Sequence, residues 1–405
     1  MKRALSIESK DMFHITIRVF VLLLLALFLC LFYTNVHVTQ TPKKLVLSTP
    51  TPYPVRTEVP IPPPVWTNYQ APVLPDEGCV PFAKLRHVWR IHGEYYAEES
   101  VLPRLCNLNQ PIHKMPETWH QNPPNVSIQW LDVVTVIQHR IYPGAFAHDV
   151  HNTLAGNLMA IFRFLSHVPY EEIPQKMREL YLDGVQVQHS ILSALSDYPV
   201  TQSSLPDTDI FFEYAMIGHY KPGGWCHQDE SWNRVSEFLS HRLCNQLVIP
   251  KDPRLVWFVN RNPGAGREVL NHDDIVSTMR SKHIEVVDTR PGTLSFQEQV
   301  CLARRASVLV GPHGANLAMM ILAGKNTSTI EIISPQFDEH YWWLYAYCSQ
   351  NRWFSFRTGV EPEGDARSRP DAGKVVELVQ QVLQNRSPVV CAKPCDKPHQ
   401  QVCEF

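Results

Sequence analysis

The stretch Ala306-Ser-Val-Leu-Val-Gly-Pro-His-Gly-Ala-Asn-Leu-Ala-Met-Met320 decides the fold of the second half of this chain. Its apolar run 308–310 predicts a buried strand that ends at Gly311, and the residues after it predict a tight turn into a helix. Further apolar runs at 255–260, 284–287 and 329–333 alternate with helical stretches. Strands and helices that alternate at this spacing predict a parallel sheet covered by helices.

The first half shows the same two kinds of pattern. Residues 130–138, WLDVVTVIQ, predict a strand, and residues 148–167 predict a helix. Its apolar stripe contains Val150, Leu154, Leu158, Ile161 and Leu165. A chain of 405 residues with 44% hydrophobic content is long enough for two domains. We therefore expect an α/β protein with two Rossmann-like domains, residues 76–250 and 251–390, facing each other across a cleft.

The N-terminal segment 15–34 is almost wholly apolar, with Arg18 as its only charge. This length suits a membrane-spanning helix, and the basic residues before it favour a cytosolic tail, 1–14, and a luminal body. A cleaved signal peptide is the alternative, and it also sends the body into the secretory pathway. We expect a single-pass type II protein of the Golgi membrane, with the endoplasmic reticulum as second choice.

The segments at both edges of the predicted body fit an exported protein. Residues 35–75 are crowded with proline and predict an extended stem. Three cysteines lie in a short tail, 391–405, which we expect disulfides to fasten. Glycosylation acceptors by pattern are Asn125, Asn326 and Asn385. No CxxC spacing repeats, which argues against structural zinc, and a net charge of −2 argues against a nucleic-acid surface.

Two loops carry residues suited to phosphate chemistry. Gly314 permits close backbone approach, and the predicted helix start after it offers unpaired N–H groups to a diphosphate. His313 is placed to hydrogen-bond a phosphate or the departing group. Arg261 and Arg267 flank a glycine-bearing loop after the strand at 255–260, where guanidinium groups bind phosphate bidentately. The alternatives are an ordinary strand-to-helix turn and two solvated arginines.

The order of motifs between residues 256 and 356 resembles glycosyltransferase family 61. The matching stretches are RNPGAGREVLN, SFQEQVCLARRASVLVGPHGANL and TIEIISP. This resemblance implies the two-domain GT-B fold, an inverting mechanism, a UDP-sugar donor and no metal or other cofactor. The donor-binding residues that it implies are Arg261, Arg267, Asn271, Gln299, His313, Gly314, Ala315, Asn316 and Glu331.

A second segment, beginning at Tyr142, resembles the N-terminal motif of the same family, in which aspartate follows a histidine by four residues. Here the histidine is His148 and the fourth position is Asn152, so the expected carboxylate is absent. Inverting transfer needs a base near the acceptor hydroxyl, and a histidine serves near neutral pH. We favour His148 or His151 over Asp149, which also fits a helix-start carboxylate. His148 and His151 lack a nearby third ligand for zinc.

The sequence leaves several alternatives open. Asp207 and Asp209 form an Asp-x-Asp pair, which another transferase class uses to hold manganese, but an apolar run follows rather than precedes it. We interpret the pair as a loop that opens a strand. The resemblance implies transfer of xylose, N-acetylglucosamine or arabinose to a glycoprotein or polysaccharide. A catalytically inactive protein that binds glycans or scaffolds other enzymes is the alternative.

Overall fold

The computed structural model describes much of the chain beyond residue 81. The described residues are 82–91, 94–97, 112–114, 128–138, 140, 142–143, 145–165, 169–181, 189–197, 201–202, 209–218, 230–246, 249–334, 342–358 and 367–384. The predicted cytosolic tail, anchor, stem and cysteine-rich tail lie outside them. Among the described residues, no helix has both the length and the apolar character needed to cross a bilayer.

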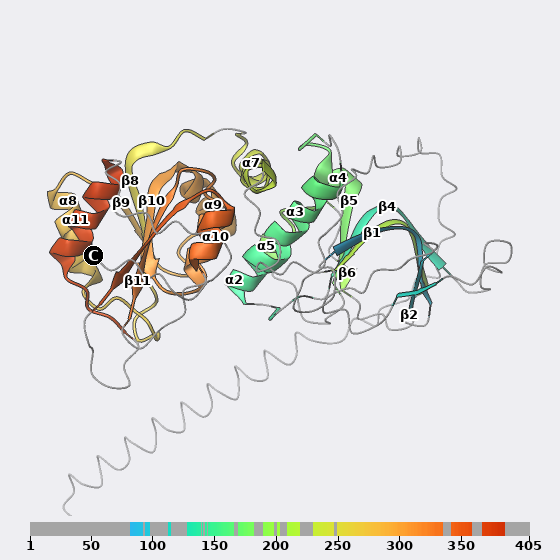
Figure 1. The fold of residues 1–405 in the computed structure, drawn as a ribbon, viewed down its shortest axis with the longest axis horizontal. Coiled ribbons are helices and arrows are strands. Elements are labelled where there is room, and N and C mark those ends of the chain that lie inside the picture. The colour runs from blue at the N-terminus through green and yellow to red at the C-terminus, as the bar shows by residue number, and fades with distance from the viewer. Residues whose placement is uncertain are drawn as a thin grey trace, which may run out of the picture. The chain divides into compact units, whose positions relative to one another are not determined.

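The second half forms a five-stranded sheet in which every strand pair is parallel. Its strands are β8 (Asp252–Val259), β9 (Glu285–Thr289), β10 (Ala306–Pro312), β11 (Ser328–Ile333) and β12 (Arg352–Arg357). They lie in the order β12-β11-β10-β8-β9, and Figure 1 labels β8, β9, β10 and β11 of this sheet. Four of these strands coincide with the apolar runs that predicted a parallel sheet, whereas the edge strand β12 was not predicted. The strand order reverses direction between β8 and β10.

Helices cover both faces of this sheet. They are α8 (His272–Ser281), α9 (Phe296–Arg305), the 3₁₀ helix η3 (Ala315–Ile321), α10 (Trp342–Cys348) and α11 (Ala372–Leu383). Apolar side chains of β8 alternate between faces, as the period of two requires. Val256 and Phe258 pack with α8 and α11, whereas Trp257 and Val259 pack with α9 and α10 (Figure 1).

The first half contains a seven-stranded mixed sheet. Its strands are β1 (Phe82–Ile91), β2 (Glu94–Ala97), β3 (Ile112–Lys114), β4 (Ile128–Gln138), β5 (Met177–Tyr181), β6 (Thr201–Gln202) and β7 (Asp209–Gly218). The order is β3-β2-β1-β7-β4-β5-β6. β7, β4, β5 and β6 are parallel, but β1 is antiparallel to β2 and β7. A wholly parallel Rossmann-like sheet is therefore not what this half shows, because too few residues separate β1 from β2 for a parallel crossover.

The predicted helix of the first half is present but is more buried than its sequence pattern indicated. It consists of α2 (Phe146–His148), the π-helix η2 (Asp149–Leu154) and α3 (Ala155–Phe164). The sequence predicted one apolar stripe, yet every residue from Asp149 to Leu165 is buried. Its polar positions find interior partners: Asn157 donates to Glu179 of β5 at 3.0 Å. One apolar cluster unites α3 with β4 and with β8 and β10.

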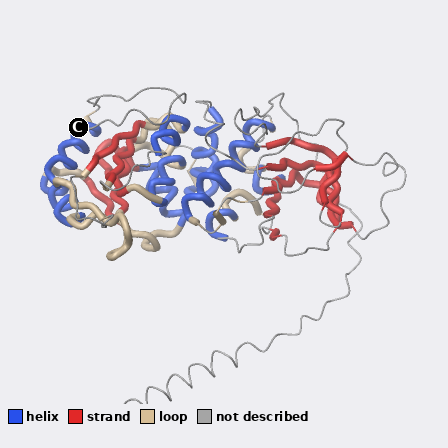
Figure 2. Tube along the Cα trace, turned by 60° about the horizontal axis from the view of Figure 1, so that its bottom comes forward, coloured by secondary structure: helices blue, strands red, loops and turns tan. Residues whose placement is uncertain are grey.

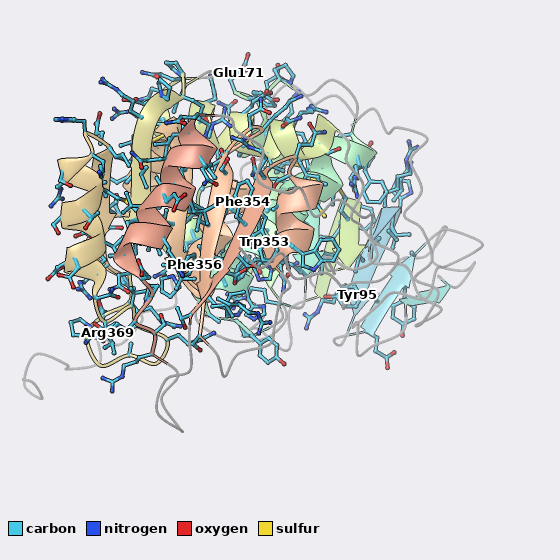
Figure 3. All side chains as sticks on the ribbon, turned by 60° about the vertical axis from the view of Figure 1, so that its left-hand side comes forward. Tyr95, Glu171, Trp353, Phe354, Phe356 and Arg369 are labelled. Atoms are coloured by element: carbon cyan, nitrogen blue, oxygen red, sulfur yellow. A yellow bond between two sulfur atoms is a disulfide. The ribbon has the colours of Figure 1, made fainter. Side chains whose placement is uncertain are left out.

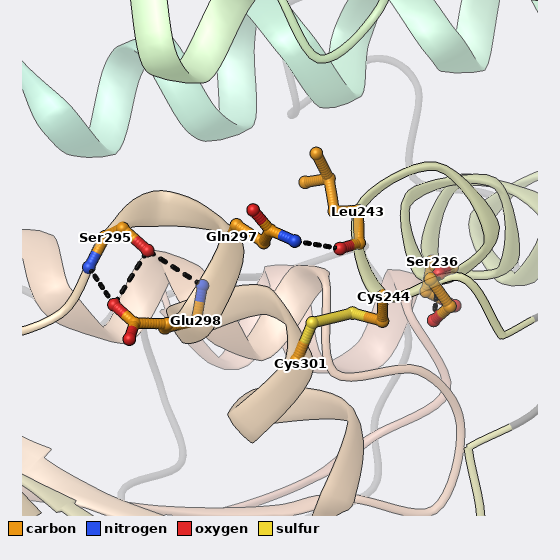
Figure 4. Close-up of a disulfide and its surroundings, with 8 residues drawn as sticks. Ser236, Leu243, Cys244, Ser295, Gln297, Glu298 and Cys301 are labelled. Atoms are coloured by element: carbon orange, nitrogen blue, oxygen red, sulfur yellow. Dashed lines mark hydrogen bonds between the residues drawn. A yellow bond between two sulfur atoms is a disulfide. The ribbon is translucent and has the colours of Figure 1, made fainter.

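Helix α7 (Glu230–Cys244) packs on both α3 and α9, and shorter helices are α4 (Ile173–Lys176) and α5 (His189–Leu192). A disulfide, Cys244–Cys301, joins the end of α7 to α9 (Figure 4). Helix α9 begins with a capping box in which Ser295 and Glu298 satisfy each other's backbone N–H groups (Figure 4). The helices (blue) and strands (red) of both halves are traced in Figure 2.

Candidate active site

The carboxyl ends of β8 and β10 meet where the strand order of the second sheet reverses. Ligands of open α/β sheets bind at such a switch point. The loop 260–271 follows β8, and His313 and Gly314 follow β10. A Cβ atom added to Gly314 would lie 2.9 Å from Nη1 of Arg261 and 3.8 Å from Cζ of Arg267. The structure therefore brings both predicted arginines against the backbone of Gly314.

The conformation of Gly314 agrees with the sequence prediction, whereas the type of helix after it does not. Gly314 has a φ of 148°, a conformation that favours glycine. The helix that follows is a 3₁₀ helix of seven residues, whereas the sequence predicted an ordinary helix start. Short 3₁₀ helices have poorer hydrogen-bond geometry than α-helices. The guanidinium groups of Arg261 and Arg267 place positive charge at this loop.

Asn260 fixes the arginine-bearing loop to the end of β8. Its side-chain oxygen accepts from the backbone N–H groups of Arg261 at 2.8 Å and Val269 at 3.0 Å, and its amide donates to Val269 O at 3.1 Å. Asn260 is fully buried, so these bonds do not compete with water. Arg290 adds a bond to the carbonyl of Arg261 at 2.5 Å. Three bonds from one side chain thus close the loop at both ends.

His313 and Glu331 form a buried pair beside this loop. Nδ1 of His313 hydrogen-bonds to Oε1 of Glu331, and Trp353 Nε1 donates to the other carboxylate oxygen at 2.8 Å. Both His313 and Glu331 are almost completely excluded from solvent. Trp353 comes from β12, where Figure 3 labels it beside Phe354 and Phe356. The carboxylate of Glu331 therefore holds His313 and Trp353 in place.

Three further residues that the family resemblance implied have hydrogen-bond partners within the protein. Asn316 Nδ2 reaches the carbonyl of Asn260 at 3.5 Å, and Ala315 opens η3. The amide of Asn271 donates to Pro370 O at 2.6 Å, and that of Gln299 donates to Leu294 O at 3.1 Å. These bonds anchor the edges of the site.

His148 lies half-buried on the first half of the chain. Its Nδ1 and the amide Nδ2 of Asn152 are 3.0 Å apart, which confirms that the two share one flank of the helix. Burial lowers the pKa of His148 below its ordinary value, because desolvation penalises the charged imidazolium. A neutral imidazole near pH 7 is the form that accepts a proton.

His151 is an interior residue. Its Nδ1 hydrogen-bonds with the hydroxyl of Tyr345 of α10 at 2.8 Å, and the edge of Trp342 packs against its ring. Burial, followed by the neighbouring His148, lowers the pKa of His151 to about 3. Neutral His151 thus joins η2 to α10, and its contact with Tyr345 occupies one ring nitrogen.

Asp149 is buried in the first half and faces Arg140. Its Oδ1 lies 3.8 Å from Nη1 of Arg140, and neither side chain is exposed to solvent. Asp149 is the acidic residue in the first turn of η2, the helix-start position that the sequence also suggested, and it is buried there. A buried ion pair thus links the first residue of η2 to Arg140, which follows β4.

The two candidate regions are packed together. Helix α2, which ends at His148, contacts η3, which begins directly after Gly314. Within the part of the chain that the structure describes, no cluster of three His, Cys, Asp or Glu residues is arranged to hold a metal ion. The strand β7 begins at Asp209, as the sequence predicted for this end of the Asp-x-Asp pair, while Asp207 lies outside the described residues.

Sequence reasoning missed three residues that shape this region, namely Asn260, Tyr345 and Trp353. The position of Asn260, at the end of an apolar strand and before the loop, was a usable signal. No sequence signal pointed to Tyr345 or Trp353, because their partners, His151 and Glu331, are 194 and 22 residues away in the chain.

Comparison with known proteins adds two findings. Residues 146–330 match the sequence model of the family described as Glycosyltransferase 61. A relative from Gallus gallus, "EGF domain-specific O-linked N-acetylglucosamine transferase", is 26% identical over 99 residues, which are 24% of this chain and 18% of the relative. The chain thus matches about a fifth of that relative's length. The matched range of the family begins with α2 and includes β8, β10 and the loops of the site.

Proposed function

Because residues 146–330 carry the glycosyltransferase family 61 sequence, we propose that this protein is an inverting glycosyltransferase. It transfers a sugar, either xylose, N-acetylglucosamine or arabinose, from a UDP-sugar to a glycoprotein or polysaccharide acceptor. The proposal includes the GT-B arrangement, with the donor bound by the second half of the chain.

The convergence of Arg261 and Arg267 on Gly314 carries this proposal. Cleavage of a UDP-sugar leaves negative charge on the diphosphate, and fixed positive groups that face this charge lower the barrier. Guanidinium groups carry positive charge and bind phosphate oxygens in a planar, bidentate manner. Together they supply two positive charges to the leaving group, so we propose that no metal cofactor is needed.

His148 is the base in this mechanism. It is neutral at working pH because burial lowers its pKa, and α2 holds it against η3. His148 takes the proton of an acceptor hydroxyl while the hydroxyl oxygen attacks the anomeric carbon. The bond from that carbon to UDP breaks on the opposite face, its electrons leave with UDP, and the anomeric configuration inverts. His313, held by Glu331, lies beside the departing diphosphate.

The cellular setting is also part of the proposal. We propose a type II protein of the Golgi membrane whose body lies in the lumen. The disulfide Cys244–Cys301 supports an oxidising compartment. The sequon residue Asn326 is exposed in a turn, as glycan attachment requires, whereas Asn125 and Asn385 lie outside the described residues.

One observation favours a second candidate, a non-catalytic relative that binds glycans or scaffolds other enzymes. Asn152 stands where the family motif has aspartate, and its amide is bonded to His148 at 3.0 Å. An amide holds the imidazole less strongly than a carboxylate does and adds no charge to raise its basicity. Intact donor loops favour the enzyme.

The test uses the full-length protein, produced in a eukaryotic host and purified in detergent. Each UDP-sugar is added with and without EDTA, and both UDP release and thermal shift are measured. We expect UDP release from one of the UDP-sugars, and we expect this activity to persist in EDTA. The double variant R261A/R267A should lose the thermal shift with UDP, while R280A, which removes an exposed arginine of α8, should keep it. Stabilisation by UDP without turnover of any sugar would favour the non-catalytic relative, and loss of turnover in EDTA would refute the metal-free mechanism.

A further inference from the structure

Tyr142 lies at the surface immediately before α2. Among the described residues it is the one large hydrophobic side chain that is exposed, with 71% of its surface accessible. Single exposed aromatic residues are common and need no explanation by themselves. Two other properties, its backbone conformation and its contact with His148, distinguish Tyr142 from such residues.

The backbone of Tyr142 adopts an unfavourable conformation. Its φ is 47°, in the left-handed region that bulky residues avoid. Pro143 follows directly, and a proline restricts the residue before it to extended conformations. A backbone hydrogen bond from Ala145 N–H to the carbonyl of Tyr142, 3.2 Å long, closes the turn. Strained conformations of this kind persist where the surrounding structure holds them, and they cluster at functional sites.

The ring of Tyr142 begins a series of tilted ring contacts that leads inward from the solvent. Its centroid lies 4.8 Å from that of His148, with the planes tilted by 50°. The ring of His148 lies 5.0 Å from that of His151, which in turn contacts Tyr345. His148 is only half-buried. The proposed base therefore has an exposed, flat apolar surface directly beside it.

We propose that Tyr142 forms the floor of an acceptor subsite for a pyranose ring. This inference rests on the function proposed above and chooses its acceptor class, a glycan rather than a serine or threonine of a peptide. A pyranose presents a flat face of C–H groups that packs on an aromatic ring, and its hydroxyl groups point outward at the edge. A sugar stacked on Tyr142 would bring such an edge to His148, which removes the hydroxyl proton. A peptide hydroxyl offers no ring-sized apolar face to Tyr142.

The experiment compares full-length wild type with Y142F, Y142L and Y142A in detergent. The probes are the methyl glycosides of glucose, galactose, mannose, xylose and N-acetylglucosamine. Binding is followed by saturation-transfer NMR without donor, and KM and kcat are measured for whichever glycoside accepts a sugar. The Y142F variant keeps the aromatic ring, whereas Y142L keeps apolar area without a flat face. The thermal shift with UDP reports whether each variant retains its fold and donor site.

We expect wild type and Y142F to bind the same glycoside. Loss of a stacked ring in Y142L and Y142A should raise KM about tenfold, with little change in kcat or in the UDP thermal shift. Equal glycoside binding by wild type and Y142A would overturn the subsite. Tyr142-dependent glycoside binding without any turnover would uphold the subsite and refute the transferase. Turnover that Y142A leaves unchanged would uphold the transferase and refute the subsite.

Discussion

The carboxylate of Glu331 accepts from both His313 and Trp353, and this bridge predicts a specific result for the substitution E331Q. A carboxylate offers two acceptor oxygens, whereas an amide offers one oxygen and one NH₂ donor. In E331Q one of the two N–H groups therefore faces another donor. Glu331 and His313 are excluded from water, so we expect a loss of about 2 kcal/mol in the free energy of unfolding.

The partner substitution W353F removes the indole N–H and leaves one buried carboxylate oxygen unpaired. Its cost should also be about 2 kcal/mol, from the same desolvation argument. In E331Q/W353F the amide oxygen accepts from His313 while the NH₂ group faces an apolar ring, so a single unpaired donor remains. The double variant should thus lose about 2 rather than about 4 kcal/mol, a coupling of about 2 kcal/mol for one shared network.

Urea unfolding followed by circular dichroism measures all four proteins of this cycle. A control cycle pairs W353F with R280A, a remote and exposed position, and should be additive within about 0.5 kcal/mol. If E331Q and W353F are also additive within that margin, Glu331 does not bridge His313 and Trp353, and our account of the His313 position is wrong.

Three further predictions concern the helix of the first half, the arginine loop and the disulfide. N152D places a carboxylate beside His148 and should raise the pKa of that imidazole by about one unit, because a nearby negative charge favours the protonated form. The base then stays protonated up to a higher pH, so the acid limb of the pH–rate profile should move to higher pH by the same amount. An acid limb at the same pH as in wild type would exclude His148 as the base. G314A should weaken UDP binding about tenfold in calorimetry, since its Cβ would meet Arg261 at 2.9 Å, whereas the control G266A has nothing within 4 Å and should bind as wild type does. C244S/C301S should lower the free energy of unfolding by about 2–4 kcal/mol, measured by urea titration, and unchanged stability would show that the bridge contributes nothing.

The parallel sheet of the second half was predictable because its strands are buried on both faces. Such strands appear in the sequence as short continuous apolar runs, and glycine marks the point where β10 ends. The convergence of Arg261 and Arg267 on Gly314 was also accessible, since the carboxyl ends of neighbouring parallel strands share one edge. These features depend on local pattern and on one general rule of topology.

Other features depend on contacts that no local pattern encodes. Trp353 meets Glu331 only because β11 and β12 pair in register, and Tyr345 meets His151 only after the two halves pack. The antiparallel strand β1 and the complete burial of α3 likewise follow from tertiary packing. Sequence periodicity alone predicts an amphipathic helix there, because it carries no information that Asn157 is bonded to the buried carboxylate of Glu179.

The π-helix between α2 and α3 has a consequence for how this chain tolerates insertions and deletions. The N–H group of Ala155 donates to the carbonyl of Val150, five residues earlier, so this turn holds one residue more than an α-helical turn. Deleting any single residue of Asp149–Leu154 would let an ordinary α-helix form without breaking the element. Because the wide turn already accommodates the extra residue, the deletion would leave the segment before it on nearly the same face relative to α3. His148 and Tyr142 would then keep their direction relative to the core on α3, so the deletion of one codon would remove the wide turn and leave the geometry of the site in place.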